Sequence, residues 1–390
     1  MTAIAQQAYQ PALFHGPAIE YSTGVYPSQK IEELIADGCV TADQRIVSDQ
    51  VQPSSLDLRL GTVAYRVRAS LLPGEASTVL KKAEDYTTHQ LDLSKPAVLE
   101  KGCVYIVPLQ EECRLPPRVG AKANPKSSIG RLDVLTRLIA DHSSEFERVA
   151  PGYRGKLYAE IAPRTFSILV QAGTRVNQIR FVRGMPRPAD SHIRRLHAER
   201  ALLYVEDEAI EEPDIDQGIW IAVDLKGLQG SGIVGYKARA HAPLVDVDRV
   251  DYYDPSEFWE PIGRPNKGRL ILNPGDFYIL ASREKMWVPP THAAEMVVYN
   301  QSVGEVRIHY AGFFDPGFGY GEDNIGTHAV LEVRSHEVPF LLEDEQRVGR
   351  LIYEKLMAPP DRLYGPAIGS SYQGQALWLS KQFKRSAAFQ

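Results

Sequence analysis

Two adjacent hydroxyls, a glycine and two basic residues fall within six positions of the sequence, Lys126–Arg131. The segment reads Lys-Ser-Ser-Ile-Gly-Arg and follows a run of residues typical of a β-strand. Hydroxyls, backbone N–H groups near a glycine and a guanidinium are the donors that bind phosphate oxygens, and arginine can do so bidentately. The alternative is an ordinary helix start, in which Ser127 or Ser128 caps the helix and Arg131 lies in solvent. The residues alone leave both possibilities open.

A second chemical feature is a turn followed by a strand that carries a glutamate. Asp315-Pro-Gly precedes a strand-like run with Glu332, and an earlier segment has the same order with Ala150 and Glu160. A glutamate that lines a closed pocket can take a proton from water and pass it to a ring nitrogen. The alternative for either glutamate is an exposed position on a strand.

Both features occur twice because the sequence contains an internal repeat. Leu99–Pro117 resembles Leu272–Pro290 at an offset of 173 residues, and Tyr158–Phe181 resembles Val330–Tyr353 at an offset of 172. The second alignment places Glu160 opposite Glu332. These matches, in order and at nearly constant offset, predict a duplicated domain.

A third, shorter match supports the duplication and helps to divide the chain. Ser54–Gly61 resembles Ile221–Leu228. We therefore expect a first copy over residues 1–190 and a second over residues 191–390. Short runs of β-branched and aromatic residues, punctuated by Gly and Pro, predict β-strands in both copies. Ser28–Gly38 has the pattern of a helix, and Pro188–Asp207 is a helix or linker between the copies.

Composition limits the class of protein. Of 390 residues, 44% are hydrophobic and 24% charged, which is ordinary for a globular protein with real cores. The net charge of −5 argues against bulk attraction to nucleic acid or to a membrane surface. Three cysteines without paired metal spacing predict a reducing compartment and no disulfide framework. We expect a cytoplasmic protein, because we find neither a signal-peptide pattern nor an apolar run long enough to span a membrane.

The order of these motifs resembles the dCTP deaminase family of the trimeric dUTPase-like superfamily. Gln52–Gly61, then Pro125–Leu132, then a Pro-Gly turn and a strand with glutamate are similar to that family, as is the tail Leu363–Gln375. The resemblance covers most of the first copy and, more weakly, the second. Its double-domain form has a similar length. The resemblance implies a mainly β fold, with two tandem dUTPase-like distorted β-barrel domains and a short N-terminal helix.

The resemblance also implies an activity, the hydrolytic deamination of dCTP to dUTP and ammonia without zinc. Zinc deaminases need a C-x-x-C pair, which this sequence lacks. The implied catalytic residues are Glu332 as general base and proton shuttle, with Ser127 and Arg131, and Glu160 as second choice. The implied substrate-binding residues are Lys126, Ser128, Ala311, Asp315, Tyr364, Tyr372 and Gln375. Mg²⁺ is expected on the triphosphate alone, and Ser371 stands where the family usually has a phosphate-binding lysine.

Differences between the copies predict that one site is divided between them. Glu305 aligns with Arg131 in our comparison, and a glutamate would repel a triphosphate. Conversely, Ala150 replaces the pocket carboxylate Asp315, and only the second copy is followed by the tail. We therefore expect Ser127, Ser128 and Arg131 to bind the triphosphate, and Ala311, Asp315, Glu332 and the tail to form the base pocket. Sites of this superfamily lie between subunits, so the resemblance also implies a homo-oligomer with trimer-like symmetry.

Two alternatives to a simple deaminase remain at this point. One is a different reaction on the same scaffold, by a dUTPase or by a bifunctional enzyme that converts dCTP to dUMP. The other is a nucleotide-binding regulator without catalysis. The resemblance also raises dTTP as an inhibitor, although no residue of this sequence indicates it. We expect no nucleic acid and no membrane as partners.

Overall fold

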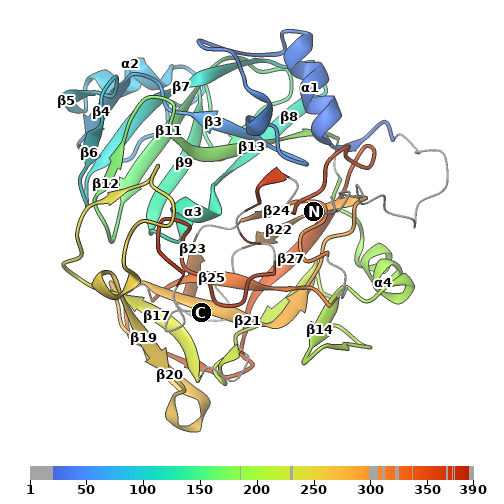
Figure 1. Ribbon diagram of the computed structural model, residues 1–390. Helices are drawn as coiled ribbons and strands as arrows, with labels where there is room; N and C mark the ends of the chain where they lie inside the picture. The colour runs from blue at the N-terminus through green and yellow to red at the C-terminus, as the bar shows by residue number, and fades with distance from the viewer. Residues whose placement is uncertain are drawn as a thin grey trace, which may run out of the picture.

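The computed structural model has two β-rich halves that follow one another along the chain (Figure 1). It describes residues 21–184, 186–228, 232–297, 306–309, 312–320, 325–335, 337–365, 368–370, 372 and 374–385. The mainly β fold with tandem copies and a short N-terminal helix, predicted from the sequence, is confirmed. No helix among the described residues is long and apolar enough to cross a membrane.

The first copy consists mainly of two sheets, ordered β1-β13-β8-β10 with β3 beside β13, and β5-β4-β7-β11-β9 with β2 beside β7. Its strands are β1 (Gly24–Val25), β2 (Val40–Ala42), β3 (Leu56–Arg59), β4 (Val63–Val67), β5 (Thr87–Asp92), β6 (Ala97–Leu99), β7 (Val104–Arg114), β8 (Val119–Pro125), β9 (Val134–Ala140), β10 (Arg148–Val149), β11 (Arg154–Pro163), β12 (Ile168–Val170) and β13 (Arg175–Arg183). Nearly all of β8 and β13 is buried, because these strands lie between the core and the second copy.

The second copy has the corresponding sheets, ordered β16-β27-β22-β24 and β15-β14-β21-β17-β19 with β25 joining β21 to β23. Its strands are β14 (Leu203–Val205), β15 (Glu208–Ala209), β16 (Ile219–Ala222), β17 (Ile233–Ala238), β18 (Val245–Asp246), β19 (Trp259–Gly263), β20 (Arg269–Leu272), β21 (Tyr278–Met286), β22 (His292–Val297), β23 (Val306–His309), β24 (Phe313–Phe314), β25 (Thr327–Ser335), β26 (Phe340–Glu343) and β27 (Arg347–Lys355). Strands β20 and β26 form a separate two-stranded antiparallel sheet, and β18 pairs in parallel with β12 of the first copy.

Helices are few and short. They are α1 (Ser28–Ala36), α2 (Val79–Glu84), α3 (Ser127–Gly130) and α4 (Asp190–Glu199), with 3₁₀ turns η1 (Ser48–Gln50), η3 (Pro255–Glu257) and η4 (Asn266–Gly268). Helix α1 matches the predicted helix and buries Ile31 and Leu34, which are one turn apart on one face. Helix α4 lies between the last strand of the first copy and the first strand of the second. The division of the chain at residue 190 stays a prediction.

The strand registers of the two copies correct one of our alignments. Leu56 pairs with Ile179, and Ile219 pairs with Leu351, which is 172 residues beyond Ile179. Leu56 is therefore equivalent to Ile219, so the alignment of Ser54–Gly61 with Ile221–Leu228 was wrong by four residues. The two segments share the dipeptide Asp-Leu, at Asp57 and at Asp224, but these residues do not occupy equivalent positions in the strands.

A second correction concerns the residue that aligns with Arg131. Val134 pairs with Pro163, and Val306 pairs with Ser335, 172 residues beyond Pro163. Counting back one residue from each valine, Glu305 is the counterpart of Asp133 rather than of Arg131. The alignment of Glu305 with Arg131 was therefore wrong, and Glu305 itself lies outside the described residues.

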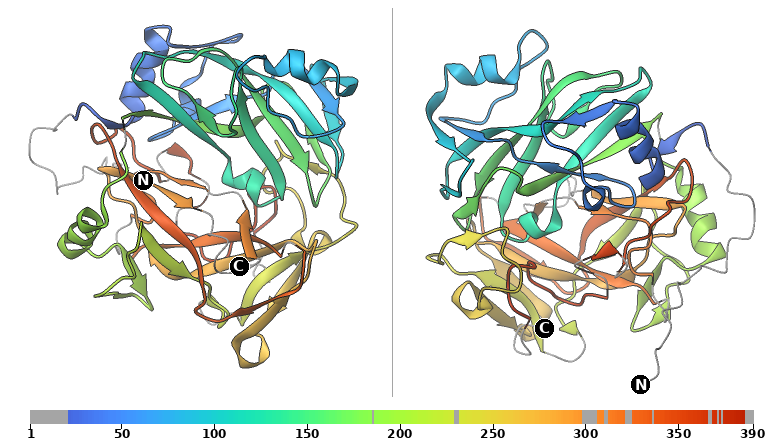
Figure 2. Two further views of the ribbon diagram at one scale, coloured as in Figure 1. Left: turned by 180° about the vertical axis from the view of Figure 1, so that it is seen from behind. Right: turned by 45° about the horizontal axis from the view of Figure 1, so that its top comes forward.

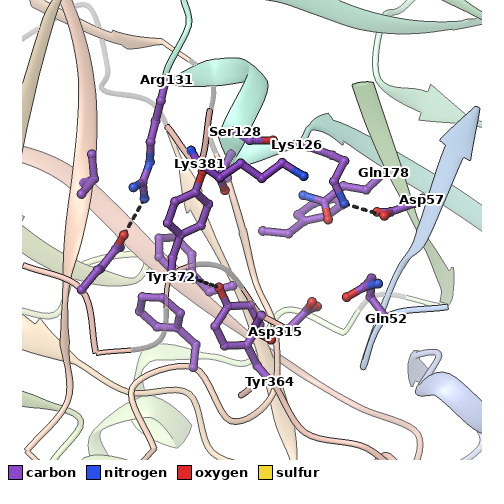
Figure 3. Close-up of a pocket in the computed structure, with 18 of the residues that line it drawn as sticks. Gln52, Asp57, Lys126, Ser128, Arg131, Gln178, Asp315, Tyr364, Tyr372 and Lys381 are labelled. Carbon is purple, nitrogen blue, oxygen red and sulfur yellow. Dashed lines mark hydrogen bonds and ion pairs between the residues drawn. The ribbon is translucent and has the colours of Figure 1, made fainter. Parts of the chain in front are cut away.

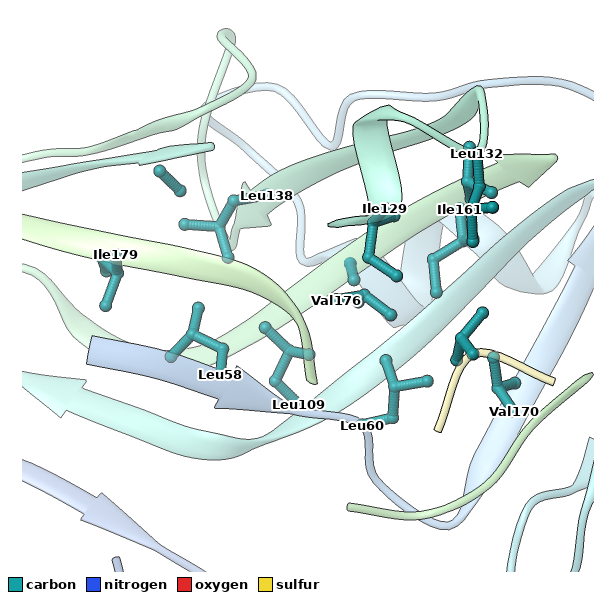
Figure 4. Close-up of a cluster of buried hydrophobic side chains, with 14 of the residues drawn as sticks. Leu58, Leu60, Leu109, Ile129, Leu132, Leu138, Ile161, Val170, Val176 and Ile179 are labelled. Carbon is teal, nitrogen blue, oxygen red and sulfur yellow. The ribbon is translucent and has the colours of Figure 1, made fainter. Parts of the chain in front are cut away.

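Each copy is built around its own apolar core. In the first, side chains from both main sheets meet beneath α3, among them Leu58, Leu109, Ile129, Leu138 and Ile179 (Figure 4). This core continues into aromatic residues of the second copy. The centroid of the Phe166 ring lies 5.5 Å from the ring centroid of Trp259 and 5.7 Å from that of Phe258. Burial of rings this large stabilises the junction of the copies.

Buried charges also join the two copies. The guanidinium of Arg334 in β25 forms an ion pair with Asp133, which is fully buried in the turn after α3. Asp133 also accepts a hydrogen bond from the Thr165 hydroxyl at 2.6 Å. Figure 2 shows that α3, which precedes this turn, lies where the strands of the first copy face those of the second. The copies therefore meet along the segment that carries the Ser-Ser-Ile-Gly motif.

Candidate functional site

A cavity of about 290 Å³ opens between the copies, beside α3. Figure 3 shows its side chains converging from segments far apart in the sequence. From the first copy it is lined by Asp49, Gln52, Asp57, Lys126, Ser127, Ser128, Arg131, Arg175 and Gln178. From the second it is lined by Met296, Gly312, Phe313, Phe314, Asp315, Phe318, Val330, Glu332, Tyr364, Ile368, Gly369, Ser370, Tyr372, Gln375 and Lys381. Both copies of a single chain thus contribute to one pocket.

The predicted hydroxyl cluster forms a single helical turn at the wall of this pocket. Helix α3 begins at Ser127 directly after β8, and the side chain of Lys126, the residue before it, makes no capping hydrogen bond. Instead, Lys126 Nζ lies 2.5 Å from Oδ2 of Asp57, which is on strand β3. A helix does start here, but its N-cap is Lys126 rather than a serine, both serines line the cavity, and Arg131 is only 3% exposed.

Arg131 lies deep in the pocket and is held by the tail. Its Nη1 donates to the carbonyl of Trp378 at 2.8 Å, and its Nη2 donates to Gln375 Oε1 at 2.7 Å. The guanidinium carbon also lies 3.8 Å from the centre of the Tyr372 ring, in a cation–π contact. The remaining nitrogen, Nε, is buried without a hydrogen-bond partner among the described residues and lies 3.9 Å from Glu332 Oε1. Its position favours a role beside Glu332 over the predicted role in binding phosphate.

Glu332 projects from β25 into the buried end of the pocket. The side chain is almost fully buried, and burial raises its pKa to about 8, although the nearby Arg131 guanidinium acts in the opposite direction. A carboxyl group with a pKa near 8 can both hold and release a proton around neutral pH. That is the property required of a general acid and base. The alternative of an exposed strand position is wrong for Glu332.

Asp315 is held by the first copy. Ser54 Oγ donates to Asp315 Oδ1 at 2.5 Å, and Arg180 Nη2 lies 3.3 Å from the same oxygen. Arg180 is fully buried and also stacks on the Phe313 ring at 4.0 Å. The arrangement leaves Asp315 Oδ2 without a hydrogen bond from these two residues, on a side chain that lines the cavity. Asp315 can therefore orient a polar group of a ligand while it anchors the junction.

The tail contributes side chains to the wall of the pocket, and its implied role in covering a nucleotide stays a prediction. Tyr364 accepts a hydrogen bond at its phenolic oxygen from the Tyr372 backbone N–H at 3.2 Å. Gln375 Nε2 donates to the carbonyl of His328 at 3.1 Å, which ties the tail to β25. All three predicted tail residues line the cavity, and aromatic side chains here form a surface suited to a flat ring.

Some predicted residues lie elsewhere. Glu160 is buried, so the exposed-strand alternative is wrong for it as well, but it does not line the cavity. It forms an ion pair with Arg137 and accepts a hydrogen bond from the Leu71 backbone at 3.3 Å. Both contacts of the Glu160 carboxylate are made within the first copy. Ala311 and Ser371 lie outside the described residues.

Other pocket residues were not predicted. Asp57, Arg175, Gln178, Phe318 and Lys381 all line the cavity. Asp57 lies within the Gln52–Gly61 motif, so its position in that motif was a usable signal. Arg175 and Gln178 are on β13, and Lys381 is on the last described segment, where no motif marks them. They come to the pocket only through the tertiary fold.

The described residues contain no group of three or more His, Cys, Asp or Glu side chains arranged to hold a metal ion. Both carboxylates at the Lys126 end already have cationic partners, Asp57 with Lys126 and Asp49 with Arg175. A Mg²⁺ ion at this end would therefore draw most of its ligands from phosphate oxygens and water, which suits the preference of Mg²⁺. This fits an ion that arrives with a nucleotide.

Comparisons with known proteins show which family the chain belongs to. Residues 22–185 match the family model of the N-terminal domain of 2'-deoxycytidine 5'-triphosphate deaminase, and residues 189–383 match that of its C-terminal domain. A crystal structure of 2'-deoxycytidine 5'-triphosphate deaminase from Agrobacterium tumefaciens is 48% identical with a TM-score of 0.82, covering 87% of this chain and 100% of that chain.

Two relatives are similar to part of the chain. A protein of Halobacterium salinarum named "dCTP deaminase, dUMP-forming" is 34% identical over 141 residues, 35% of this chain and 67% of the relative. A dCTP deaminase of Haloarcula marismortui is 30% identical over 177 residues, 43% of this chain and 82% of the relative. Each match spans less than half of this chain, whereas the Agrobacterium structure spans most of it.

Proposed function

The chain is an enzyme of the dCTP deaminase family, in its double-domain form, and on that premise we propose that it hydrolyses dCTP to dUTP and ammonia. The observation that carries this proposal is Glu332, a buried pocket carboxyl whose pKa is raised to about 8. Its surroundings are those expected for deamination of a cytosine ring, with a proton-transfer group, aromatic walls and polar groups at the opposite end.

The reaction adds water to C4 of the ring and removes ammonia. Glu332 takes a proton from water as the oxygen bonds to C4, and passes that proton to the ring nitrogen N3. The proton of the new C4 hydroxyl is then transferred to the amine, the C4–N bond breaks, and ammonia leaves behind a carbonyl at C4. The overall reaction converts dCTP and water to dUTP and ammonia, and its atoms and charges balance. No metal takes part in these steps, so the proposed mechanism is independent of zinc.

Arg131 acts in this proposal mainly through Glu332. Its Nε lies 3.9 Å from the carboxyl and carries a fixed positive charge, which stabilises the carboxylate after a proton is given up. Ser127 and Ser128 offer hydroxyls nearby, so Ser127 can also orient the water. Ala311, implied by the resemblance to position the water and the amine, stays a prediction.

The other end of the pocket suits the triphosphate. Lys126, Arg175 and the serine hydroxyls offer cationic and neutral donors to phosphate oxygens. Mg²⁺ is proposed only as the ion bound to the triphosphate, whose charge it reduces. Asp315 is proposed to orient the sugar-base portion, and Tyr364, Tyr372 and Gln375 to cover the nucleotide.

The test is to incubate the purified chain with dCTP and Mg²⁺, measure ammonia release, and separate the nucleotides by chromatography. Formation of dUTP and ammonia in equal amounts supports the proposal. Binding of dCTP with no ammonia release would replace it with the regulatory alternative. Activity lost after zinc-specific chelation and restored by zinc would contradict the proposed mechanism.

A second candidate is deamination followed by release of pyrophosphate, giving dUMP. The relative named "dUMP-forming" favours it, because that name describes this product. The same chromatogram decides between the candidates, since dUMP and pyrophosphate appear only in the second. Addition of dTTP to the same assay tests the predicted inhibition.

The homo-oligomer with trimer-like symmetry stays a proposal, and so does the cytoplasmic location. The described lining of the pocket comes from one chain, so an oligomer is not needed to bring those residues together. Light scattering coupled to size-exclusion chromatography measures the mass of the particle, and a monomer would contradict the oligomer.

A further inference from the structure

The cations of the pocket are not equivalent. In the described lining they are Lys126, Arg131, Arg175 and Lys381. Three have a carboxylate partner within the pocket: Lys126 with Asp57 at 2.5 Å, Arg175 with Asp49 at 3.0 Å, and Arg131 with Glu332 at 3.9 Å. For the ammonium of Lys381, no hydrogen-bond or ion-pair partner exists among the described residues.

The backbone of Lys381 is nevertheless firmly anchored. Its N–H donates to the Tyr372 hydroxyl at 3.2 Å, and its carbonyl accepts from the Asp251 N–H at 2.9 Å. On its C-terminal side, Gln382 is fully buried and donates to the Val247 carbonyl at 2.7 Å, and Phe383 packs in the core. An anchored backbone with an unpaired side-chain charge is the arrangement of a ligand-binding residue.

The surroundings of Lys381 favour an anion. Figure 3 shows its side chain extending across the pocket with the ammonium end toward Lys126. Burial, followed by the charge of Lys126, lowers the pKa of Lys381, although the carboxylates of Asp57 and Asp248 act in the opposite direction. Two ammonium groups in one partly buried space repel each other, and a ligand with several negative oxygens would relieve this repulsion.

We infer that Lys381 is a phosphate-binding residue, which contacts the phosphate groups of the nucleotide from beside α3. Serine hydroxyls, Lys126 and Lys381 surround one space, and together they offer the mixture of neutral and cationic donors that phosphate groups accept. The segment that covers the base through Tyr372 therefore also contacts the phosphates through Lys381. The inference rests on the proposed function for the identity of the nucleotide, but not for the phosphate chemistry.

The test uses Lys381→Met in the full chain, with Lys384→Met as matched control, because Lys384 is exposed three residues further along. Calorimetry measures the affinity of each protein for inorganic tripolyphosphate with Mg²⁺, and a steady-state assay measures kcat and KM for dCTP. Loss of one charge-assisted hydrogen bond weakens binding about 10- to 100-fold. We expect this loss in tripolyphosphate affinity and in KM for Lys381→Met, with kcat nearly unchanged, and no effect of Lys384→Met.

Lys381→Arg keeps the charge, so recovery of affinity in this variant shows that the loss comes from the cation rather than from misfolding. The inference is overturned if Lys381→Met binds tripolyphosphate as wild type does, if the Lys384→Met control loses as much, or if wild type does not bind it. The two proposals fail separately. If the wild type does not deaminate dCTP but its tripolyphosphate affinity depends on Lys381, only the proposed function is contradicted. If the Lys381→Met enzyme is active and its affinity and KM are unchanged, only this inference is contradicted.

Discussion

The Nε atom of Arg131 lies 3.9 Å from Oε1 of Glu332, although the two residues belong to different copies of the repeated domain. Each is almost fully buried, and each is fixed by its own copy or by the tail that follows the second. The buried carboxyl of Glu332 and the cation beside it therefore meet only when the two copies are packed together. The two copies of the repeated domain in one chain thus contribute different residues to a single site.

Replacing Glu332 by Gln should abolish deamination while leaving dCTP binding nearly intact. The amide keeps the shape of the side chain but cannot take a proton from water, and general-base catalysis contributes about 10²- to 10⁴-fold. We expect kcat to fall about 10³-fold, as measured by ammonia release.

Glu160→Gln is the matched control, because Glu160 is the equivalent residue of the first copy. It is bound to Arg137 away from the cavity, so kcat should stay within about twofold while stability falls by on the order of 1–3 kcal/mol. Equal losses of kcat in the two variants would show that the second copy does not carry the reaction alone.

The raised pKa of Glu332 has a consequence for stability. In the unfolded chain this carboxyl loses its proton near pH 4.5, but in the folded chain it keeps the proton until about pH 8. The raised pKa therefore does not lower the free energy of unfolding below pH 4.5. Between pH 4.5 and about pH 8 it lowers that free energy progressively as the pH rises. Glu332→Gln removes this effect, so the variant should gain stability relative to wild type across that range, by at most about 1.4 kcal/mol per pH unit.

Urea unfolding of both proteins at pH 5, 6, 7, 8 and 9 measures this difference in the free energy of unfolding. The gap should widen from pH 5 to pH 8 and then level off. A constant gap, or one that narrows as the pH rises, would mean that Glu332 is not the buried carboxyl described here.

The strands and the duplication were predictable because β-branched alternation and repeated segments are local properties of the sequence. The contacts that complete the site are not local. Ser54 and Asp315 are 261 residues apart, and Arg131 is 247 residues from Trp378. The resemblance to a family predicted one site divided between the two copies. Lys381 belongs to no recognised motif, so the sequence did not predict it as a pocket residue.

The errors of alignment have a physical reason. A strand is identified by its partners across the sheet, whereas a short sequence match is identified by shared letters. Asp57 and Asp224 share the letters Asp-Leu, yet the register makes Asp57 equivalent to Trp220.

The ion pair between Asp133 and Arg334 should contribute strongly to the cohesion of the copies. Both side chains are buried, so Asp133→Asn, which keeps the shape and tolerates the φ of +55° at this position, leaves the arginine without a counter-charge. Removing one partner of a buried pair costs about 3–5 kcal/mol. Chemical denaturation should show a loss of this size.

The control for this pair is Glu260→Gln, which removes the partner of Arg239 in an ion pair of 2.8 Å on the surface. Exposed pairs contribute about 0–1 kcal/mol, so little stability should be lost. A similar loss in both variants would argue that Asp133 and Arg334 do not hold the copies together.

Arg131→Lys should be a severe substitution even though it keeps the positive charge. The guanidinium donates from two nitrogens, to Trp378 and to Gln375, and stacks on Tyr372. A lysine ammonium is a point charge that cannot satisfy these separate directions at once. The tail should therefore loosen, and Glu332 should lose a cation held at a fixed place. We expect kcat/KM for dCTP to fall about 10²-fold.

Two measurements separate this explanation from general unfolding. Limited proteolysis should cut the segment after residue 364 faster in Arg131→Lys, while the melting temperature stays close to that of wild type. Arg239→Lys, on the surface, should change neither quantity. An Arg131→Lys enzyme with full activity and a protected tail would contradict the role of the guanidinium, because charge alone would then suffice to hold the tail and to tune the glutamate.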